Sequence, residues 1–468
     1  MNISTSTEQT IADATAYILG NDFDISELPQ AIQPLAQHAI EEDKFKGKEN
    51  SLRAYPALGL NNSKWIFFAG AGSKDIDGYR RAAGEIGHQA REKGLSSVSV
   101  ISDGDPNVLI TAIGTGNYRF DCNSNEKSRK QPLTDLYLSN LTEDDNIDRA
   151  TGILNGRTLA RDLINMPPAD LYPDTLAQEA LKLVGDQITV EVWDEKKLKE
   201  EGMGGIIAVG QGSTNPPRFI HLHYTPKGTR SKTVAIIGKG VTFDAGGLSL
   251  KTSAGMQTMR CDMAGSGTVL GIFKALAQVK PNVEVHGLIG AAENMCSAGA
   301  YKLGDVLRMR NGKTVEIHNT DAEGRLVMAD CLAYGSELKV DEMIDIATLT
   351  GACMVALGRW YSGLFSNEED MVKALLGSAD NAGEGLWRLP LPDFYKAQLK
   401  TEWADVKNVG GRMGGAITAA LFLSNFVDGP KWAHIDIAGP AFNDKRYGHL
   451  TSGATGTMVE TLIDWLDS

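Results

Sequence analysis

Apolar and polar positions along the chain predict two regions of α/β structure. In the first region, apolar runs at 65–69 and 108–114 indicate buried strands, and residues 73–93 between them have helical character. The polar stretch 121–132 has no apolar period and predicts a surface loop. We therefore expect a small N-terminal α/β domain over residues 1–135.

A linking helix is expected within residues 136–170. Acidic residues at 143–145 suit a helix N-terminus, where they favour the helix dipole. Ile147, Ala150 and Ile153 then recur on one helical face. The prolines at 167–168 are expected to end the helix.

From residue 171 to residue 468, strand and helix patterns alternate. The candidate buried strands are 233–238, 283–289, 314–318, 343–347 and 433–438. Helical patterns such as 268–279 separate them, and this alternation is typical of βαβ units with parallel strands. The expected fold class is α/β, with a smaller N-terminal domain and a larger C-terminal domain whose central sheet is mixed, largely parallel and covered by helices.

Polar clusters follow two of these predicted strands. Lys239 and Asp244 come after the strand at 233–238, and Asp321 and Glu323 come after the strand at 314–318. Ligands of open α/β sheets bind outside the carboxyl ends of the strands. The two clusters could therefore converge on one crevice.

Each of these charged residues also has a purely structural interpretation. Asp321 and Glu323 precede an apolar helix that begins near Leu326, where acids cap free N–H groups and favour the dipole. Arg325, taken alone, would form an ion pair at the surface. Asp262 lies just ahead of the helix at 268–279 and could likewise cap the N-terminus of that helix.

The grouping of these residues favours a metal site over capping. Four acids near element ends, accompanied by Lys239, Lys251 and a Gly-Gly pair at 246–247, are hard to explain as caps. Carboxylates with few histidines suit Mg²⁺, Mn²⁺ or Zn²⁺. Acids that share two ions are the layout of two-metal hydrolases, but acids alone do not separate amide from phosphate-ester hydrolysis. His221 and His223 alternate with apolar neighbours, which favours strand positions over metal ligation.

Charge and cysteine content narrow the class of protein. The net charge of −13 argues against a general nucleic-acid or anionic-membrane binder. No apolar run is long enough for a transmembrane helix, and the first 20 residues have no signal-peptide pattern. The five widely spaced cysteines form neither a disulfide framework nor a Cys-x-x-Cys zinc pattern, so a cytoplasmic location is expected.

The two polar clusters resemble a known family. Asn319-Thr-Asp-Ala-Glu-Gly-Arg-Leu326 is similar to the signature octapeptide of the leucyl (cytosol) aminopeptidase family, and the stretch 238–251 resembles that family's other metal-binding segment. The supporting matches are 162–168, 259–263, 347–351 and 432–439, so the resemblance covers roughly residues 150–468. It implies that residues 171–468 form a metallopeptidase domain. The reaction would be removal of N-terminal amino acids, leucine and other apolar residues favoured, from peptides with a free N-terminus.

The resemblance also implies a role for each site residue. Two divalent ions, Mn²⁺ or Zn²⁺, are expected per subunit. The tighter one would be held by Lys239, Asp244, Asp262 and Glu323, and the exchangeable one by Asp244, Asp321 and Glu323. A metal-bridging water would be the nucleophile, Lys251 would stabilise the oxyanion, and Arg325 would hold a bicarbonate ion as general base. An apolar pocket for the first side chain would be bordered by Met259, Thr348, Leu349 and Gly351.

Further expectations come from the same resemblance. The family implies a homohexamer of two stacked trimers. Two positions differ from the residues that are common in the family: Ala245 stands where serine is common, and Cys261 where alanine is common. These differences bear on which metal is preferred, not on which reaction is catalysed. The competing hypotheses are a two-metal phosphoesterase and a moonlighting DNA-binding regulator, for which the acidic balance gives no positive support.

Overall fold

The computed structural model describes residues 1–6, 10–121 and 131–468, and Cys122 lies outside these ranges. The chain forms two compact units. Unit 1 contains residues 1–154 and 444–452, and unit 2 contains residues 155–443 and 453–468. Within the described ranges, no helix combines the length and the apolar character needed to cross a membrane.

Unit 1 is built on a six-stranded sheet in the order β1-β6-β5-β2-β4-β3. All neighbouring strands are parallel except the antiparallel pair β3–β4. The strands are β1 (Asn2–Thr5), β2 (Ala14–Gly20), β3 (Leu52–Pro56), β4 (Trp65–Gly72), β5 (Ser97–Ile101) and β6 (Asp135–Leu138). The helical elements are η1 (Ile25–Glu27), α1 (Gln33–Glu41), α2 (Ile76–Lys93) and α3 (Pro106–Asn117).

The strand predicted at 108–114 is wrong, because these residues lie in α3. The side chain of Asp105 accepts a hydrogen bond from Asn107 N, and Pro106 occupies the first helical turn. Both features start a helix. The helix is apolar on nearly every side because it is buried, and a short apolar run does not distinguish a buried helix from a buried strand.

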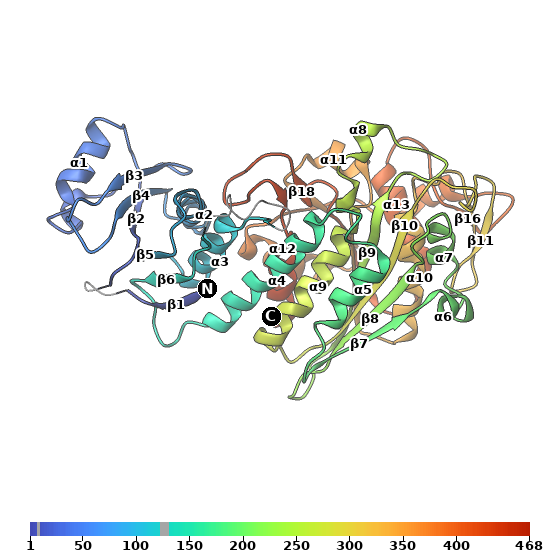
Figure 1. The fold of residues 1–468 in the computed structure, drawn as a ribbon. Helices are drawn as coiled ribbons and strands as arrows, with labels where there is room; N and C mark the ends of the chain where they lie inside the picture. The colour runs from blue at the N-terminus through green and yellow to red at the C-terminus, as the bar shows by residue number, and fades with distance from the viewer. Residues whose placement is uncertain (7–9, 122–130) are drawn as a thin grey trace. The chain divides into compact units, whose positions relative to one another are not determined.

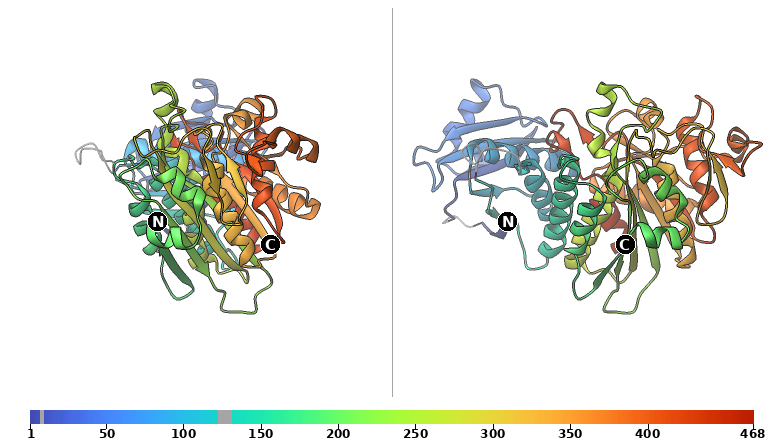
Figure 2. Two further views of the ribbon diagram at one scale, coloured as in Figure 1. Left: turned by 90° about the vertical axis from the view of Figure 1, so that its right-hand side faces the viewer. Right: turned by 45° about the vertical axis from the view of Figure 1, so that its right-hand side comes forward.

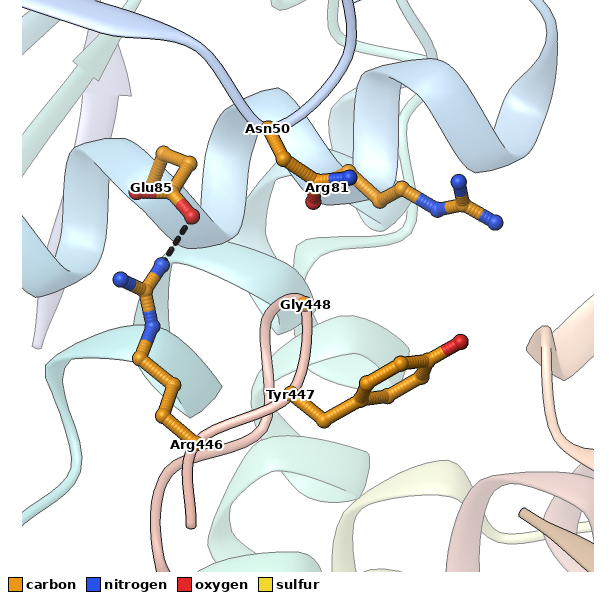
Figure 3. Close-up of a pocket in the computed structure, with 6 residues that line it drawn as sticks. All are labelled: Asn50, Arg81, Glu85, Arg446, Tyr447 and Gly448. Carbon is orange, nitrogen blue, oxygen red and sulfur yellow. Dashed lines mark hydrogen bonds and ion pairs between the residues drawn. The ribbon is translucent and has the colours of Figure 1, made fainter.

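A segment from near the C-terminus, residues 444–452, belongs to unit 1 (Figure 3). Arg446 of this segment forms an ion pair with Glu85 of α2. A Cβ atom on Gly84 would lie 2.2 Å from the Cβ of His449, so the glycine permits a close approach of this segment to the helix. Two parts of the chain more than 350 residues apart therefore pack together within one unit.

The expected linking segment, 136–170, holds more than a helix. It begins in strand β6 of the unit 1 sheet, and its helix, α4 (Ile147–Asn165), starts only after the acidic residues at 143–145. Gly156 of α4 packs against Gly271 in unit 2, where a Cβ on Gly156 would lie 2.3 Å from the Gly271 carbonyl oxygen.

Unit 2 contains an eight-stranded sheet in the order β15-β14-β17-β13-β9-β10-β8-β7. Strands β17, β13, β9 and β10 at its centre are parallel, whereas β14–β17, β10–β8 and β8–β7 are antiparallel pairs. The strands are β7 (Ile188–Trp193), β8 (Arg218–Tyr224), β9 (Thr233–Asp244), β10 (Glu284–Asn294), β13 (Glu342–Ala347), β14 (Tyr361–Phe365), β15 (Gly385–Arg388) and β17 (Lys431–Asp436). The predicted fold class, with a mixed and largely parallel sheet in the larger domain, is confirmed.

Helices cover both faces of this sheet (Figures 1 and 2). The helical elements are α5 (Pro173–Leu181), α6 (Glu195–Glu200), α7 (Gly204–Gly210), α8 (Ser253–Met256), η3 (Met259–Met263), α9 (Ala264–Val279), α10 (Gly324–Glu337), α11 (Gly351–Leu357), α12 (Glu369–Ala382), η4 (Asp393–Leu399), α13 (Gly415–Leu423), η5 (Ser424–Phe426) and α14 (Val459–Asp467). Along β9, Ala235 and Ile237 join the core formed with α7 and α10, while Gly238 on the other face approaches α9. This alternation directs Lys239 toward the start of α10.

The predicted strand at 314–318 does not belong to the central sheet. Its residues 314–316 form β12 (Thr314–Glu316), which pairs with β11 (Val306–Arg308) and β16 (Val406–Lys407) in a separate three-stranded sheet. Val315 and Ile317 still pack into the core under α10, which explains the apolar pattern. A further pair, β18 (Phe442–Asn443) and β19 (Gly453–Ala454), completes the strands of unit 2 among the described residues.

Candidate active site

Lys239 lies within β9 rather than after it, and its ammonium is surrounded by acceptors. Nζ lies 2.8 Å and 2.7 Å from the two carboxylate oxygens of Asp262 on η3, and 2.9 Å from Glu323 Oε1. It also donates to the carbonyl oxygen of Thr348, at 3.1 Å, just beyond β13. Three separate segments therefore meet at one buried lysine.

Lys251 joins the second pair of acids. Its Nζ lies 2.9 Å from Asp244 Oδ2, at the end of β9, and 2.5 Å from Asp321 Oδ1, in the turn before α10. Asp244 Oδ1 accepts a hydrogen bond from Gly246 N at 2.8 Å. The two polar clusters predicted from the sequence thus converge, although their strands belong to different sheets.

Asp244, Asp262 and Glu323 form a compact group of carboxylates. One oxygen from each lies within 4.8 Å of the others, and all three side chains are buried. Glu323 is the N-cap residue of α10, yet its side chain makes no cap hydrogen bond, and its Oε2 has no hydrogen-bonding partner in the described part of the chain. Buried carboxylates are normally paired or bound to a metal, so this donor set fits a divalent cation.

The electrostatics of the group point the same way. Burial and the charge of Glu323 raise the pKa of Asp244, and burial raises the pKa of Asp262 well above its usual range. Burial opposes the charged form of Lys239, but attraction to Asp262, Glu323 and Asp244 outweighs it and raises the pKa of this lysine. The site therefore has an excess of negative charge that an added cation would relieve. A neutral Lys239, as metal ligation requires, depends on the positive charge of bound dications.

Arg325, the second residue of α10, is buried and interacts with the charge of Glu323. Its Nη1 donates to the carbonyl oxygen of Asn408 at 2.7 Å, and its Nε has no partner among the described residues. Burial lowers the pKa of the guanidinium to about 10, while Glu323 and Asp436 oppose the shift, so the side chain is positive at neutral pH. A buried guanidinium with an unused N–H donor is suited to a small planar anion.

The four residues expected to border a side-chain pocket have different environments. Thr348 donates its hydroxyl to Asp262 Oδ1 at 2.8 Å, and Leu349 packs partly against the core. Met259 is half-buried on η3, and Gly351 begins α11 with open space where a Cβ would lie. Their roles in substrate binding stay predictions.

Two asparagines that sequence reasoning missed position the acids. Asn294, the last residue of β10, donates 2.8 Å to Asp244 Oδ1 and 3.0 Å to the carbonyl oxygen of Thr320. The side-chain oxygen of Asn408 accepts from the backbone N–H of His318 at 2.8 Å, and its Nδ2 donates to the carbonyl oxygen of Asn319 at 2.6 Å. The predicted strand at 283–289 ends five residues before Asn294, because β10 is longer than its apolar run indicates, and no sequence pattern marked Asn408.

Cys261 is a buried thiol beside Asp262. Burial and the Asp262 charge raise its pKa to about 12, so it is a neutral thiol at physiological pH. Ala245 is also buried, directly after Asp244.

Comparison with known proteins shows the family of the chain. Residues 158–463 match the "Cytosol aminopeptidase family, catalytic domain", and residues 19–127 match the N-terminal domain of the same family. The chain belongs to the cytosol aminopeptidase family. It is accordingly a metallo-aminopeptidase, a hydrolase, and the family predicted from the sequence is confirmed.

Relatives of this aminopeptidase match along nearly their whole length. A probable cytosol aminopeptidase of Aquifex aeolicus is 44% identical over 455 residues, covering 94% of this chain and 92% of the relative. A structure of a tomato leucine aminopeptidase mutant has a TM-score of 0.91 at 33% identity, covering 100% of this chain and 96% of that chain. The bottromycin maturation enzyme BotP, in complex with Mn, has a TM-score of 0.87 at 32% identity, covering 97% and 99%.

Proposed function

We propose that this cytosol aminopeptidase removes leucine and other apolar residues from the N-termini of peptides, in the cytoplasm, with two divalent ions per subunit. The observation that carries the proposal is the convergence of Lys239, Lys251 and the acids from three segments on one buried group. The Mn bound in the BotP structure supports Mn²⁺, with Zn²⁺ as the other candidate.

The acids divide naturally between two ions. The tighter ion would be held by Lys239, Asp244, Asp262 and Glu323. The exchangeable ion would be held by Asp244, Glu323 and Asp321, including the Asp321 carbonyl oxygen. Two such dications would lower the pKa of a bound water, which would make it nucleophilic at neutral pH, and would polarise the scissile carbonyl.

Lys251 is proposed to stabilise the oxyanion of the tetrahedral intermediate. Its pKa is raised because the attraction of Asp244, Asp321 and Glu323 outweighs the effect of burial, so the side chain keeps its proton. A charged donor held between Asp244 and Asp321 is fixed before the reaction begins. Such preorganised donors lower the barrier where negative charge develops.

Arg325 is proposed to hold a bicarbonate ion that accepts a proton from the attacking water. Its support is the guanidinium described above, fixed at one end by Asn408 and with Nε unpaired among the described residues. The planar fork matches a planar anion of this size. Neutralising Arg325 should therefore abolish any dependence of the rate on bicarbonate.

The apolar preference is assigned to Met259, Thr348, Leu349 and Gly351. Gly351 leaves open space beside partly exposed Leu349, in the segment that continues from Thr348. Because Thr348 also contacts Asp262, this segment would place a substrate side chain beside the proposed metal ligands.

Hydrolysis of leucine p-nitroanilide and Leu-Gly by Mn²⁺-, Zn²⁺- and Co²⁺-loaded protein tests the proposal. Asp321→Asn should lower kcat/KM by about a thousandfold, because charge stabilisation by a metal is worth several kcal/mol and about 1.4 kcal/mol is tenfold. Asp393→Asn is the matched control, since Asp393 is an exposed partner of Lys396 and its loss should leave the rate unchanged.

Two outcomes would reject this function. A chain that releases no amino acid with any of the three metals is not an aminopeptidase of this kind. If the same preparations instead hydrolyse p-nitrophenyl phosphate, the two-metal phosphoesterase is favoured, and a salt-dependent DNA gel shift would favour the regulatory role.

We also propose a homohexamer. One chain has a mass of 50.3 kDa, so sedimentation should give a species of about six times that mass. A fully active species of 50.3 kDa would contradict the assembly.

A further inference from the structure

Three histidines and a glutamate gather on one face of the unit 2 sheet, away from the acids described above. His223 of β8 lies directly opposite His286 of β10 in the antiparallel register, and His221 lies two residues farther along β8. Glu284 lies two residues before His286 on β10. Because side chains alternate between the faces of a strand, all four project to the same side, where His221 contacts Tyr334 of α10.

This cluster (His221, His223, Glu284 and His286) is far from the catalytic carboxylates. Glu284 pairs with Thr233 at the start of β9, whereas Asn294 pairs with Asp244 at its end. Eight residues separate His286 from Asn294 along β10, roughly 26 Å at the usual strand rise. The cluster is therefore a separate feature of the catalytic domain.

The side chains of the cluster already contact one another at ligand-like distances. His223 Nε2 lies 2.8 Å from Glu284 Oε1, and His221 Nε2 lies 2.9 Å from His286 Nδ1. One ligand atom from each of His223, Glu284 and His286 lies within 4.8 Å of the other two. Two imidazoles and a carboxylate form a common donor set for zinc.

The second oxygen of Glu284 has a partner that can move away. Arg230 pairs with Glu284 Oε2, and its side chain is 64% exposed, so it can retreat into solvent while Oε1 stays available.

We propose that His223, Glu284 and His286 bind a single borderline dication, with Zn²⁺ as the expected ion. The ion would lie between His223 Nε2 and Glu284 Oε1. In a tetrahedral zinc site these two atoms are about 3.3 Å apart, given bond lengths of about 2.0–2.1 Å. The present separation of 2.8 Å would open by about half an ångström. The rings of His223 and His286 stack with 8° between their planes, so one ring must also turn before both nitrogens point at the ion.

His221 is the positioning residue of the proposed site. It contacts His286 Nδ1, which leaves Nε2 as the other ring nitrogen of His286 for the ion, and its own Nδ1 lies 3.3 Å from the hydroxyl of Tyr334 on α10. Second partners of this kind fix the ring and tautomer of a ligating histidine. The His221→Gln chain should therefore keep the site but bind zinc about 10–100-fold more weakly.

Zinc stoichiometry tests the proposal directly. After equilibrium dialysis of the full chain at several zinc concentrations, zinc per chain is measured by atomic emission. The His223→Asn and Glu284→Gln chains should each hold one ion fewer than the wild-type chain. His38→Asn removes a histidine from α1 in unit 1 and is the matched control, with no expected loss.

The comparison is a difference between chains, so it does not depend on how many ions the catalytic site holds. Ions that remain bound to the variants show that the fold is intact. Electron spin-echo spectra of a Cu²⁺-substituted sample should show the remote nitrogens of imidazole, and these signals should vanish in His223→Asn. Equal stoichiometry in all four chains, or spectra without imidazole signals, would overturn the proposal.

Discussion

Gly324, the first residue of α10, is where a single added methyl group should disable the active site. A Cβ atom built on Gly324 lies 2.4 Å from Lys239 Cε and 2.6 Å from Lys239 Nζ. Carbon atoms in contact normally lie about 3.5–4.0 Å apart, so in Gly324→Ala the lysine must move by about 1 Å. The lysine side chain cannot move away freely, because Asp262 and Glu323 hold its Nζ.

The size of the effect follows from this displacement. A misplacement of about 1 Å in a catalytic arrangement costs roughly a hundredfold in rate. Global stability should change much less, because alanine in a helix is favoured over glycine by up to about 1 kcal/mol, which offsets part of the strain. Gly324→Ala is therefore expected to lower kcat/KM about a hundredfold with a nearly unchanged unfolding midpoint.

The assay is hydrolysis of leucine p-nitroanilide over a range of Mn²⁺ concentrations, with urea unfolding of the same samples. Gly377→Ala is the control, because Gly377 is exposed in the middle of α12 and its Cβ would meet nothing within 4 Å. This control should be slightly more stable and fully active. A Gly324→Ala chain with wild-type kcat/KM and wild-type metal dependence would refute the reasoning.

Three further predictions follow from buried polar groups. Arg157→Met removes the buried cation that pairs with Glu384 and Glu460 and should lower the free energy of unfolding in urea by about 3–5 kcal/mol, whereas Arg388→Met, which breaks an exposed pair, should cost less than about 1 kcal/mol. Burial raises the pKa of Asp330 to about 7, so the folded state binds this proton more tightly than the unfolded state, and stability should fall as pH rises from about 4 through about 7. Asp330→Asn should flatten that part of the curve, and an equally steep decline in the variant would contradict the assignment. Asn294→Ala removes the 2.8 Å hydrogen bond to Asp244 and should raise the Mn²⁺ concentration for half-maximal activity about 10–100-fold.

The sequence located most of the elements around the site but not all of their partners. The apolar runs that predicted β9, β10, β13 and β17 succeeded because buried parallel strands are continuous in apolar residues and bounded by turns. The run at 108–114 failed because a fully buried helix has the same appearance. The strand predicted at 314–318 was placed in the wrong sheet, because the sequence of a strand does not show which distant strand it pairs with.

Local composition alone determined the chemical character of this protein. The sequence places Asp321, Glu323 and Arg325 in one short segment, and Lys239, Asp244 and Lys251 in another, and this grouping favours ion binding over helix capping. These features are local, and a residue's type and its neighbours in the chain are sufficient to express them.

Only the tertiary structure decided what these groups contact. The pairing of β10 with β9 sets Asn294 against Asp244, and the pairing of β10 with β8 sets His286 opposite His223. From the sequence alone, the alternation along β8 indicated only that His223 is a strand residue. Both contacts join residues more than 45 positions apart. Their geometry depends on strand register and on the packing of α10 against the sheet, and these are properties of the whole fold rather than of any segment.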